Sequence, residues 1–149
     1  MNDQLLKFNL HQAIASDLDF IWQLRVITMK EAIAKSYGWD EQIQRSYAAE
    51  SLEGKIILVE GKKAGVITIS DWGAQLHLTF IALLPQYQNK GLGSKLIRYV
   101  QAQARKSNKP LTLQVLESNT AKLFYEKHGF QVCDRRSADK LLMRWEYNT

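Results

Sequence analysis

This chain contains almost no cysteine, little proline and no long apolar run. With Cys133 as its sole cysteine, it can hold neither an internal disulfide framework nor a site built from several cysteine ligands. No apolar stretch approaches the ~20 residues that span a bilayer, and the first residues lack the apolar core of a signal peptide. Linkers and low-complexity segments are also missing. We therefore predict a single domain over residues 1–149 and a cytoplasmic location.

Long basic runs are missing as well, although the net charge is +5. A basic balance is compatible with an anionic partner such as a nucleic acid, a membrane surface or a phosphorylated cofactor. The densest cluster, "RRSADK", is too short to favour nucleic acid, so we expect neither a nucleic-acid nor a membrane partner. The three histidines are scattered, with no i, i+4 pair, and we expect no metal. The oligomeric state is left open, with a homodimer as one option.

Hydrophobic patterning predicts strands and helices in the order β-α-α-β-β-β-α-β-α-β-β. Ser16 and Asp40 are expected to cap the first two helices, and Gly129 should end the last one. Because helices separate some strands and hairpins join others, the fold class is α/β (α+β) with a mixed sheet. The predicted strands cover residues 5–13, 55–60, 64–70, 74–84, 111–116, 130–135 and 140–147.

The turn "QNKGLGS", residues 88–94, carries the most chemical information. It joins a strand to a helix, so its backbone N–H groups and the helix dipole form a site for anionic oxygens. Gly91 permits a φ that other residues resist, and Gly93 lets a ligand approach the backbone without meeting a Cβ. The turn is not a Walker loop. Nor is it a Rossmann fingerprint, because Leu96 stands where the third glycine would be.

Two motifs of this sequence resemble those of one family. The segment 88–93, "QNKGLG", resembles the Q/R-x-x-G-x-G/A loop of the GNAT superfamily of acyl-CoA-dependent N-acetyltransferases. The segment 119–130, "NTAKLFYEKHGF", resembles that family's second signature, and "LHQAIASD" at 10–17 resembles its first strand and helix. The resemblance implies a single-domain GNAT-like mixed sheet of about seven strands with about four flanking helices. That sheet would splay open between the strand ending at Leu84 and the strand Leu111–Leu116.

The resemblance also implies that acetyl-CoA is the cosubstrate and that its pyrophosphate lies on the turn. Tyr125 takes the position of the tyrosine that protonates the CoA sulfur in the family. A backbone N–H near Leu83 or Leu84, freed by a bulge, would stabilise the oxyanion. Asn119 would bond the pantetheine arm, cap the helix, or do both. The implied cofactor-binding residues are Leu83, Leu84, Gln88, Asn89, Lys90, Gly91, Leu92, Gly93, Ser94, Asn119 and Tyr125.

The implied function is transfer of an acetyl group from acetyl-CoA to a primary amine of a small molecule by direct attack. The alternatives are a peptide or protein amine as acceptor, and a non-catalytic acyl-CoA-binding sensor on the same fold. A nucleic-acid-binding module has only the net charge in its favour. Cys133 follows Phe130 and Val132 on a strand, and we expect it to be a buried apolar residue rather than a nucleophile.

The general base is open among several groups. His77 stands where some family members carry a glutamate, and an imidazole with a pKa near ~6.5 can accept a proton at neutral pH. Glu117, Asp71 and ordered water are rivals. His128, at a helix end, suits the helix dipole as a cation, and we give it no catalytic role. The catalytic candidates are therefore Tyr125 and His77.

The acceptor amine should lie near the first two helices, where "TMKEAIAKSYGWDEQIQRSYAAE" resembles a GNAT subgroup with a "TMKEY…WGWDE" segment. Acidic side chains there could attract a cationic amine, and aromatic rings could line its path. The same residues could equally serve helix ends and core packing. The substrate-binding candidates are Glu31, Tyr37, Trp39, Trp72 and Glu117.

Overall fold

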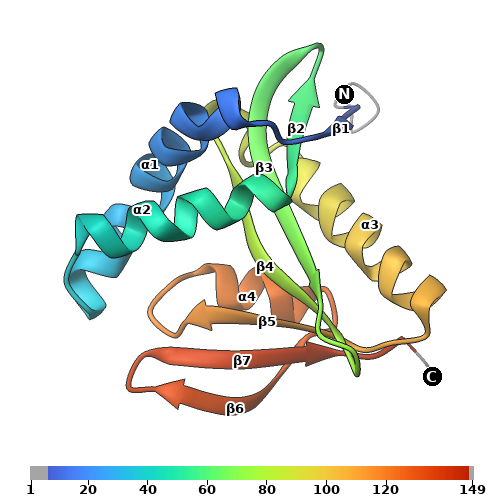
Figure 1. Cartoon of the computed structure of the whole chain (residues 1–149). Helices are drawn as coiled ribbons and strands as arrows, with labels where there is room; N and C mark the ends of the chain where they lie inside the picture. Colours follow the sequence, from blue (N-terminus) through green and yellow to red (C-terminus); the bar gives the residue numbers. More distant parts are fainter. Residues whose placement is uncertain (1–6, 148–149) are drawn as a thin grey trace. The chain divides into compact units, whose positions relative to one another are not determined.

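The computed structural model of the chain describes residues 7–147. Figure 1 shows the arrangement of its elements along the chain. The helices are α1 (Leu18–Ser36), α2 (Glu41–Glu50), α3 (Leu92–Ser107) and α4 (Ala121–Lys127), with short 3-10 turns at Ala15–Asp17, Ser51–Glu53 and Pro85–Tyr87. The strands are β1 (Asn9–Gln12), β2 (Lys55–Val59), β3 (Lys62–Asp71), β4 (Leu76–Leu83), β5 (Leu111–Leu116), β6 (Gln131–Ser137) and β7 (Lys140–Trp145).

The strands form one mixed sheet in the order β1-β2-β3-β4-β5-β7-β6. β1–β2, β2–β3, β5–β7 and β6–β7 pair antiparallel, whereas β4 and β5 pair parallel. The parallel register joins Leu76–Leu78 to Leu111–Leu113, at the start of both strands. If the two strands separate farther along their length, this is the end at which they remain paired. The predicted fold class, an open mixed sheet of seven strands with four helices, is confirmed.

Two helix starts were predicted, and the structure confirms one of them. The Asp40 carboxylate accepts a hydrogen bond from the backbone N–H of Ile43 at 3.0 Å, as an N-cap of α2 should. Ser16, in contrast, is not the cap of α1, because it lies inside the preceding 3-10 turn. The Asp17 carboxylate instead accepts from the N–H of Ile14 at 2.9 Å and pairs with Lys63. The first predicted strand begins with Leu5 and Leu6, which lie outside the described residues.

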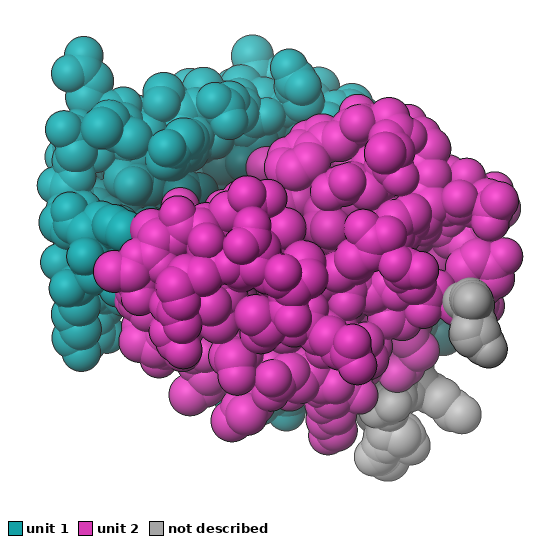
Figure 2. Space-filling view, turned by 90° about the horizontal axis from the view of Figure 1, so that it is seen from below, with its two compact units in different colours: residues 1–68, 80–93 teal, residues 69–79, 94–149 magenta. Residues whose placement is uncertain are grey.

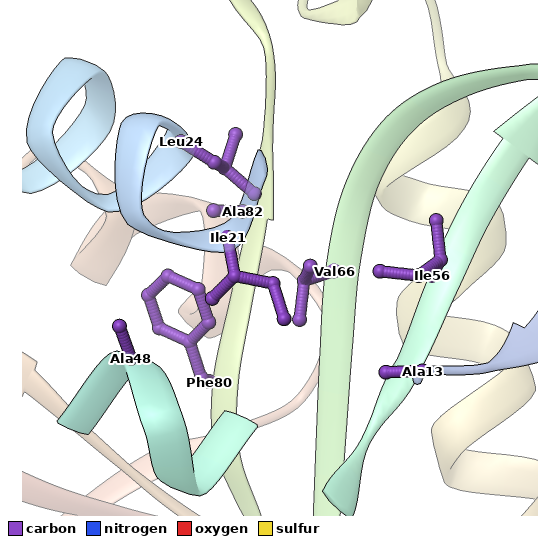
Figure 3. Close-up of a cluster of buried hydrophobic side chains, with 8 residues drawn as sticks. All are labelled: Ala13, Ile21, Leu24, Ala48, Ile56, Val66, Phe80 and Ala82. Carbon is purple, nitrogen blue, oxygen red and sulfur yellow. The ribbon is translucent and has the colours of Figure 1, made fainter. Parts of the chain in front are cut away.

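The chain divides into two compact units (Figure 2). Unit 1 contains the described residues through Thr68 together with Phe80–Gly93, and unit 2 contains Ile69–Thr79 and the described residues from Ser94 onward. In unit 1, α1 and α2 lie side by side (Figure 1). Their apolar faces and the strands form a buried cluster (Figure 3) of Ala13, Ile21, Leu24, Ala48, Ile56, Val66, Phe80 and Ala82. This cluster holds β4 and the segment that leads into the turn.

A buried cation lies beside this cluster in unit 1. Arg25 on α1 is 8% exposed, and its Nε donates to Oε1 of Gln44 on α2 at 2.8 Å. The guanidinium carbon lies 5.2 Å from the ring centroid of Tyr47 and 5.1 Å from that of Phe80. Burial lowers the pKa of Arg25. Two aromatic faces and an amide replace water around the charge. Because these groups lie on α2 and β4, Arg25 joins α1 to both elements.

In unit 2, β5 is the central strand, because it pairs with β4 on one side and with β7 along its whole length on the other. Apolar residues at i, i+4 spacing form a stripe on α3, and this stripe is fully buried at Leu96, Val100 and Ala104. Gly129 follows the end of α4 with φ +91°, as a C-terminal stop requires. A Cβ at Gly129 would meet the Trp145 ring at 3.2 Å. This glycine therefore serves both the backbone conformation and the close packing of β7.

The prediction that Cys133 is a buried apolar residue is wrong. Cys133 is exposed, and so is every residue of β6. β6 is the last strand in the sheet order, and its register with β7 shifts between Val132 and Asp134. Such an irregularity breaks the alternation of inward and outward side chains on which the prediction depended.

Candidate active site

The turn at residues 88–94 has the backbone that its sequence predicts. Asn89 and Gly91 are left-handed, with φ of 60° and 85°, and α3 begins at Leu92. Asparagine tolerates this conformation and glycine adopts it freely. The first N–H groups of a helix have no acceptor within the helix, and the turn contains no acidic side chain. The turn is therefore suited to bind an anion through its backbone.

The strand end before the turn is held by two hydrogen bonds within unit 1. The N–H of Leu84 donates to the carbonyl of Ala64 at 2.8 Å, and the side chain of Gln88 donates from Nε2 to the carbonyl of Leu83, also at 2.8 Å. The Leu84 amide is thus engaged, which leaves Leu83 as the predicted oxyanion donor. The Gln88 side chain thus bonds the strand end to the start of the turn. Its Oε1 and its backbone are the parts of Gln88 that would contact a ligand.

Tyr125 lies on α4 between two phenylalanine rings. The ring centroids of Phe124 and Phe130 are 5.4 and 5.7 Å from its own, both in edge-to-face geometry. Burial raises the pKa of Tyr125 to about 12. The phenol therefore keeps its proton throughout the physiological pH range, and it is available as a hydrogen-bond donor.

Two predicted residues of the β5–α4 connection already have partners in unit 2. The Asn119 side chain accepts from the N–H of Ala121, the first residue of α4, at 2.8 Å. Asn119 precedes the N-cap residue Thr120, and its NH₂ group is left for other contacts. Glu117 pairs with Arg135 at 2.9 Å. That hydrogen bond lowers the pKa of Glu117, and a carboxylate held in this way is a weaker base.

His77 is buried in unit 2, contrary to the expectation of a histidine with an ordinary pKa. Its ring stacks on Trp72 at 3.8 Å with 12° between the planes, and its Nδ1 lies 2.8 Å from Oγ1 of Thr112. The Thr112 hydroxyl in turn accepts from Nε2 of Gln75 at 3.0 Å. Burial, with a smaller contribution from Arg136, lowers the pKa of His77 to about 4. At neutral pH the imidazole is uncharged and weakly basic.

The lowered pKa of His77 predicts that the free energy of unfolding decreases as the pH is lowered. An unfolded histidine takes up a proton near pH ~6.5, whereas folded His77 does so only near pH 4. Stability is therefore fully present above pH ~6.5 and is lost as the pH falls toward 4. A pKa shift of this size corresponds to a loss of about 3 kcal/mol in the free energy of unfolding. Screening by water reduces this loss to about 2 kcal/mol.

Urea unfolding of the wild type and of His77→Gln tests this between about pH 7 and pH 4. Glutamine cannot titrate and can still bond Thr112, so the free energy of unfolding of His77→Gln should fall less steeply. His128 titrates in both proteins and cancels in the comparison. Parallel pH profiles would show that His77 ionises normally.

Three of the predicted acceptor-binding residues lie in unit 1. Glu31 is highly exposed and lies 3.8 Å from Lys35, and Tyr37 is half-exposed. Trp39 lies 5.9 Å from Trp22. Lys30 lies over the Trp39 ring at 5.6 Å and Arg45 over Trp22 at 4.1 Å. Each of the two indole rings therefore already makes a cation–π contact, with Lys30 or Arg45. We expect no cationic substrate group to stack on them.

The remaining base candidate, Asp71, is engaged as well. Its Oδ1 accepts from Nζ of Lys109 at 2.8 Å and from the N–H of Gly73 at 2.9 Å. The Lys109 hydrogen bond lowers the pKa of Asp71. Trp72, beside it, is half-exposed and covers His77. In unit 2 the structure thus places Trp72 with His77, and Asp71 and Glu117 each in an ion pair.

Sequence patterns missed one polar pair in unit 2. Oγ of Ser94, in the first turn of α3, lies 3.0 Å from Nε2 of His128, at the end of α4. No local pattern joins residues so far apart in sequence. Burial, together with Arg98 and Lys127, lowers the pKa of His128, so this residue is not the cation that its place at a helix end suggested.

Two features are absent from residues 7–147. No helix in this range has the length and apolarity needed to cross a bilayer. Within the same residues, no three side chains of His, Cys, Asp or Glu are grouped so that they could hold a metal ion.

Comparison with known proteins identifies the family. Residues 23–144 match the acetyltransferase (GNAT) domain family. The chain belongs to this family. The GNAT resemblance of the two motifs is confirmed, and this GNAT protein is an acyltransferase. A comparison with curated protein sequences found no match.

Solved structures similar to this GNAT chain include two N-acetyltransferases and a protein bound to a bisubstrate analogue. The PaiA N-acetyltransferase of Thermoplasma acidophilum, in complex with coenzyme A, has a TM-score of 0.74 and 17% identity over 95% of this chain and 99% of that one. The ribosomal-protein-S18-alanine N-acetyltransferase of Escherichia coli has a TM-score of 0.74 and 21% identity over 96% of each chain. Naa50 of Arabidopsis thaliana, in complex with the bisubstrate analogue CoA-Ac-MVNAL, has a TM-score of 0.69 and 18% identity over 94% and 99%. At these identities the likeness is one of fold.

Proposed function

We propose that this GNAT chain transfers the acetyl group of acetyl-CoA to a primary amine of a small molecule. The observation that carries the proposal is the turn 88–94, whose left-handed Asn89 and Gly91 lead directly into α3. Backbone N–H groups at a helix start bind phosphate oxygens, and Lys90 adds a positive charge to the same turn. Acetyl-CoA supplies the acyl group, and its diphosphate is the part that fits this turn.

The reaction requires three things of the protein. The attacking amine must be neutral, because an ammonium of pKa ~10.4 has no lone pair. As its nitrogen bonds to the thioester carbon, charge develops on the carbonyl oxygen, and the N–H of Leu83 is our proposed donor to that oxygen. When the C–S bond breaks, Tyr125 donates a hydrogen bond to the leaving sulfur or transfers its proton to it, and a tyrosinate formed in this way takes a proton back from solvent water. The amide product then carries the acetyl group, and the amine's surplus proton passes to a base.

For that base, the structure favours water or His77 over the carboxylates. Asp71 and Glu117 are each held in an ion pair, which weakens both as proton acceptors. His77 is neutral at pH 7 but has a pKa of about 4. A base that weak cannot efficiently deprotonate an ammonium of pKa ~10.4. We therefore propose that the amine enters in its neutral form. The proton released after attack then passes through ordered water to the solvent, with His77 as the alternative acceptor.

A peptide or protein amine is the second candidate acceptor. Two structural neighbours favour a peptide or protein acceptor, since one acts on an alanine of ribosomal protein S18 and the other is bound to a CoA–peptide analogue. Glu31, in an exposed position on α1, could attract a cationic group of either acceptor.

A turnover screen separates these functions. Purified protein is mixed with acetyl-CoA and with sets of amines, polyamines, amino acids and peptides, and free CoA thiol is measured. We expect thiol release with at least one set, at a rate that rises with pH as the amine loses its proton. Release with peptides alone would favour the second candidate. CoA binding without turnover on any set would identify a non-catalytic acyl-CoA sensor, and absence of CoA binding would refute the proposal.

A further inference from the structure

The Ser94–His128 pair of unit 2 contains a residue, His128, to which the proposed function gives no role. Ser94 is the last residue of the turn 88–94 and lies in the first turn of α3, and its side chain is partly exposed. His128 is the C-cap residue of α4. Their side chains meet at 3.0 Å, between Oγ and Nε2. The residue directly after the first motif thus contacts a residue of the second motif.

His128 is held firmly enough to act as a support. Its backbone N–H donates to the carbonyl of Tyr125 at 3.0 Å, and its own carbonyl accepts from Nε2 of Gln101 at 2.9 Å. Its ring packs against Phe124 at 4.8 Å between centroids. Ser94 and Gln101 lie on one face of α3 at i, i+7 spacing. His128 is therefore bonded to α3 at two points, through its ring nitrogen and through its backbone carbonyl.

The donor and acceptor roles follow from the chemistry of a phosphate ligand. Diphosphate oxygens at neutral pH only accept hydrogen bonds, so a serine hydroxyl that contacts them must donate its single proton to them. Oγ can then accept a hydrogen bond from a neighbour. A neutral imidazole with its proton on Nε2 supplies that bond. The geometry thus allows a chain from Nε2–H of His128 through the hydroxyl of Ser94 to a phosphate oxygen.

We propose that His128 is a positioning residue for acetyl-CoA, which aims the Ser94 hydroxyl at the diphosphate through the Nε2–Oγ bond. The proposal rests on the proposed function, because it assigns the diphosphate to the turn 88–94. It goes beyond that function by assigning a role to a residue outside the turn. An undirected hydroxyl would lose rotational freedom on binding, and the bond to His128 removes part of that cost in advance.

The test compares a ligand with a diphosphate to one without it. Dissociation constants of CoA are measured by calorimetry and those of pantetheine, which has no diphosphate, by NMR titration. His128→Ala should weaken CoA binding about tenfold, which is about 1.4 kcal/mol, and should leave pantetheine binding unchanged. His128→Gln, whose amide can replace Nε2–H, should recover most of the affinity. His11→Ala, which removes an exposed imidazole from β1, should bind CoA like the wild type.

Further variants test whether His128 orients the Ser94 hydroxyl or only holds α3 and α4 together. Ser94→Ala should weaken CoA binding as much as His128→Ala, and the double variant should lose no more than either single one. If His128→Ala does not fold, Ser94→Ala with CoA and pantetheine carries the same comparison. Unchanged CoA affinity in the variants, or equal losses for both ligands, would overturn the proposal while the wild type still binds CoA. A wild type that does not bind CoA would instead overturn the proposed function.

Discussion

Gly91→Val should weaken CoA binding about a hundredfold or more, because two or more charge-assisted hydrogen bonds would be lost. Gly91 has φ +85°, a conformation in which a β-branched residue is strained. Valine would either move the turn to a negative φ or place its methyl groups over the N–H groups that face the ligand. In both cases the backbone donors no longer converge on one diphosphate. Calorimetry with CoA measures the effect directly.

The matched control for Gly91→Val is Gly61→Val. Gly61 has φ +79° in the turn between β2 and β3, and a Cβ there would meet nothing within 4 Å. Both variants therefore introduce the same backbone strain, of about 1–3 kcal/mol, and their losses in unfolding free energy should be similar. Only Gly91→Val should lose CoA. Intact CoA affinity in a folded Gly91→Val protein, or an equal loss in Gly61→Val, would contradict the pyrophosphate assignment.

Tyr125→Phe should lower kcat about a hundredfold, the range expected for loss of a general acid, and should change the CoA dissociation constant by no more than about threefold. Phenylalanine keeps the edge-to-face contacts with Phe124 and Phe130 and removes only the hydroxyl. The departing thiolate then has no donor. In the wild type, burial raises the pKa of Tyr125 to about 12, so ionisation of this tyrosine should not reduce activity until the pH approaches that value.

Tyr147→Phe is the control for Tyr125→Phe. It removes a phenol hydroxyl from a side chain that is 42% exposed and that contacts Asn108 at 3.5 Å. Its kcat should match that of the wild type with the amine identified by the turnover screen. Were Tyr125→Phe to turn over as fast as Tyr147→Phe, the proton donor to the leaving group would have to be another group.

The strands and helices of this chain could be predicted from local patterns. The apolar run ending at Leu84, the polar turn and the i, i+4 stripe on α3 each depend on neighbours in sequence. Asp40 and Gly129 were predicted as helix boundaries, because a carboxylate next to free N–H groups and a glycine at positive φ act within a few residues. The left-handed turn at Asn89 and Gly91 is of the same kind.

The environments of titratable side chains could not be predicted in this way. The pKa of His77 depends on its burial, under a ring of Trp72 that stacks on it, and on the charge of Arg136 on another strand. Asp71 is paired by Lys109, which is distant in sequence. A pKa responds to burial and to charges within a few ångströms, and neither quantity is local in the chain. The expectation of an ordinary histidine pKa at residue 77 was wrong for this reason.

From sequence alone come the order of the elements, the left-handed backbone of the turn and the position of Tyr125 in its motif, since each depends on residues a few positions apart. Folding in three dimensions was needed to expose Cys133 on an edge strand, to bury His77 and to join Ser94 to His128. These outcomes depend on which segments meet in space, because desolvation and hydrogen bonding act over ångströms rather than along the chain.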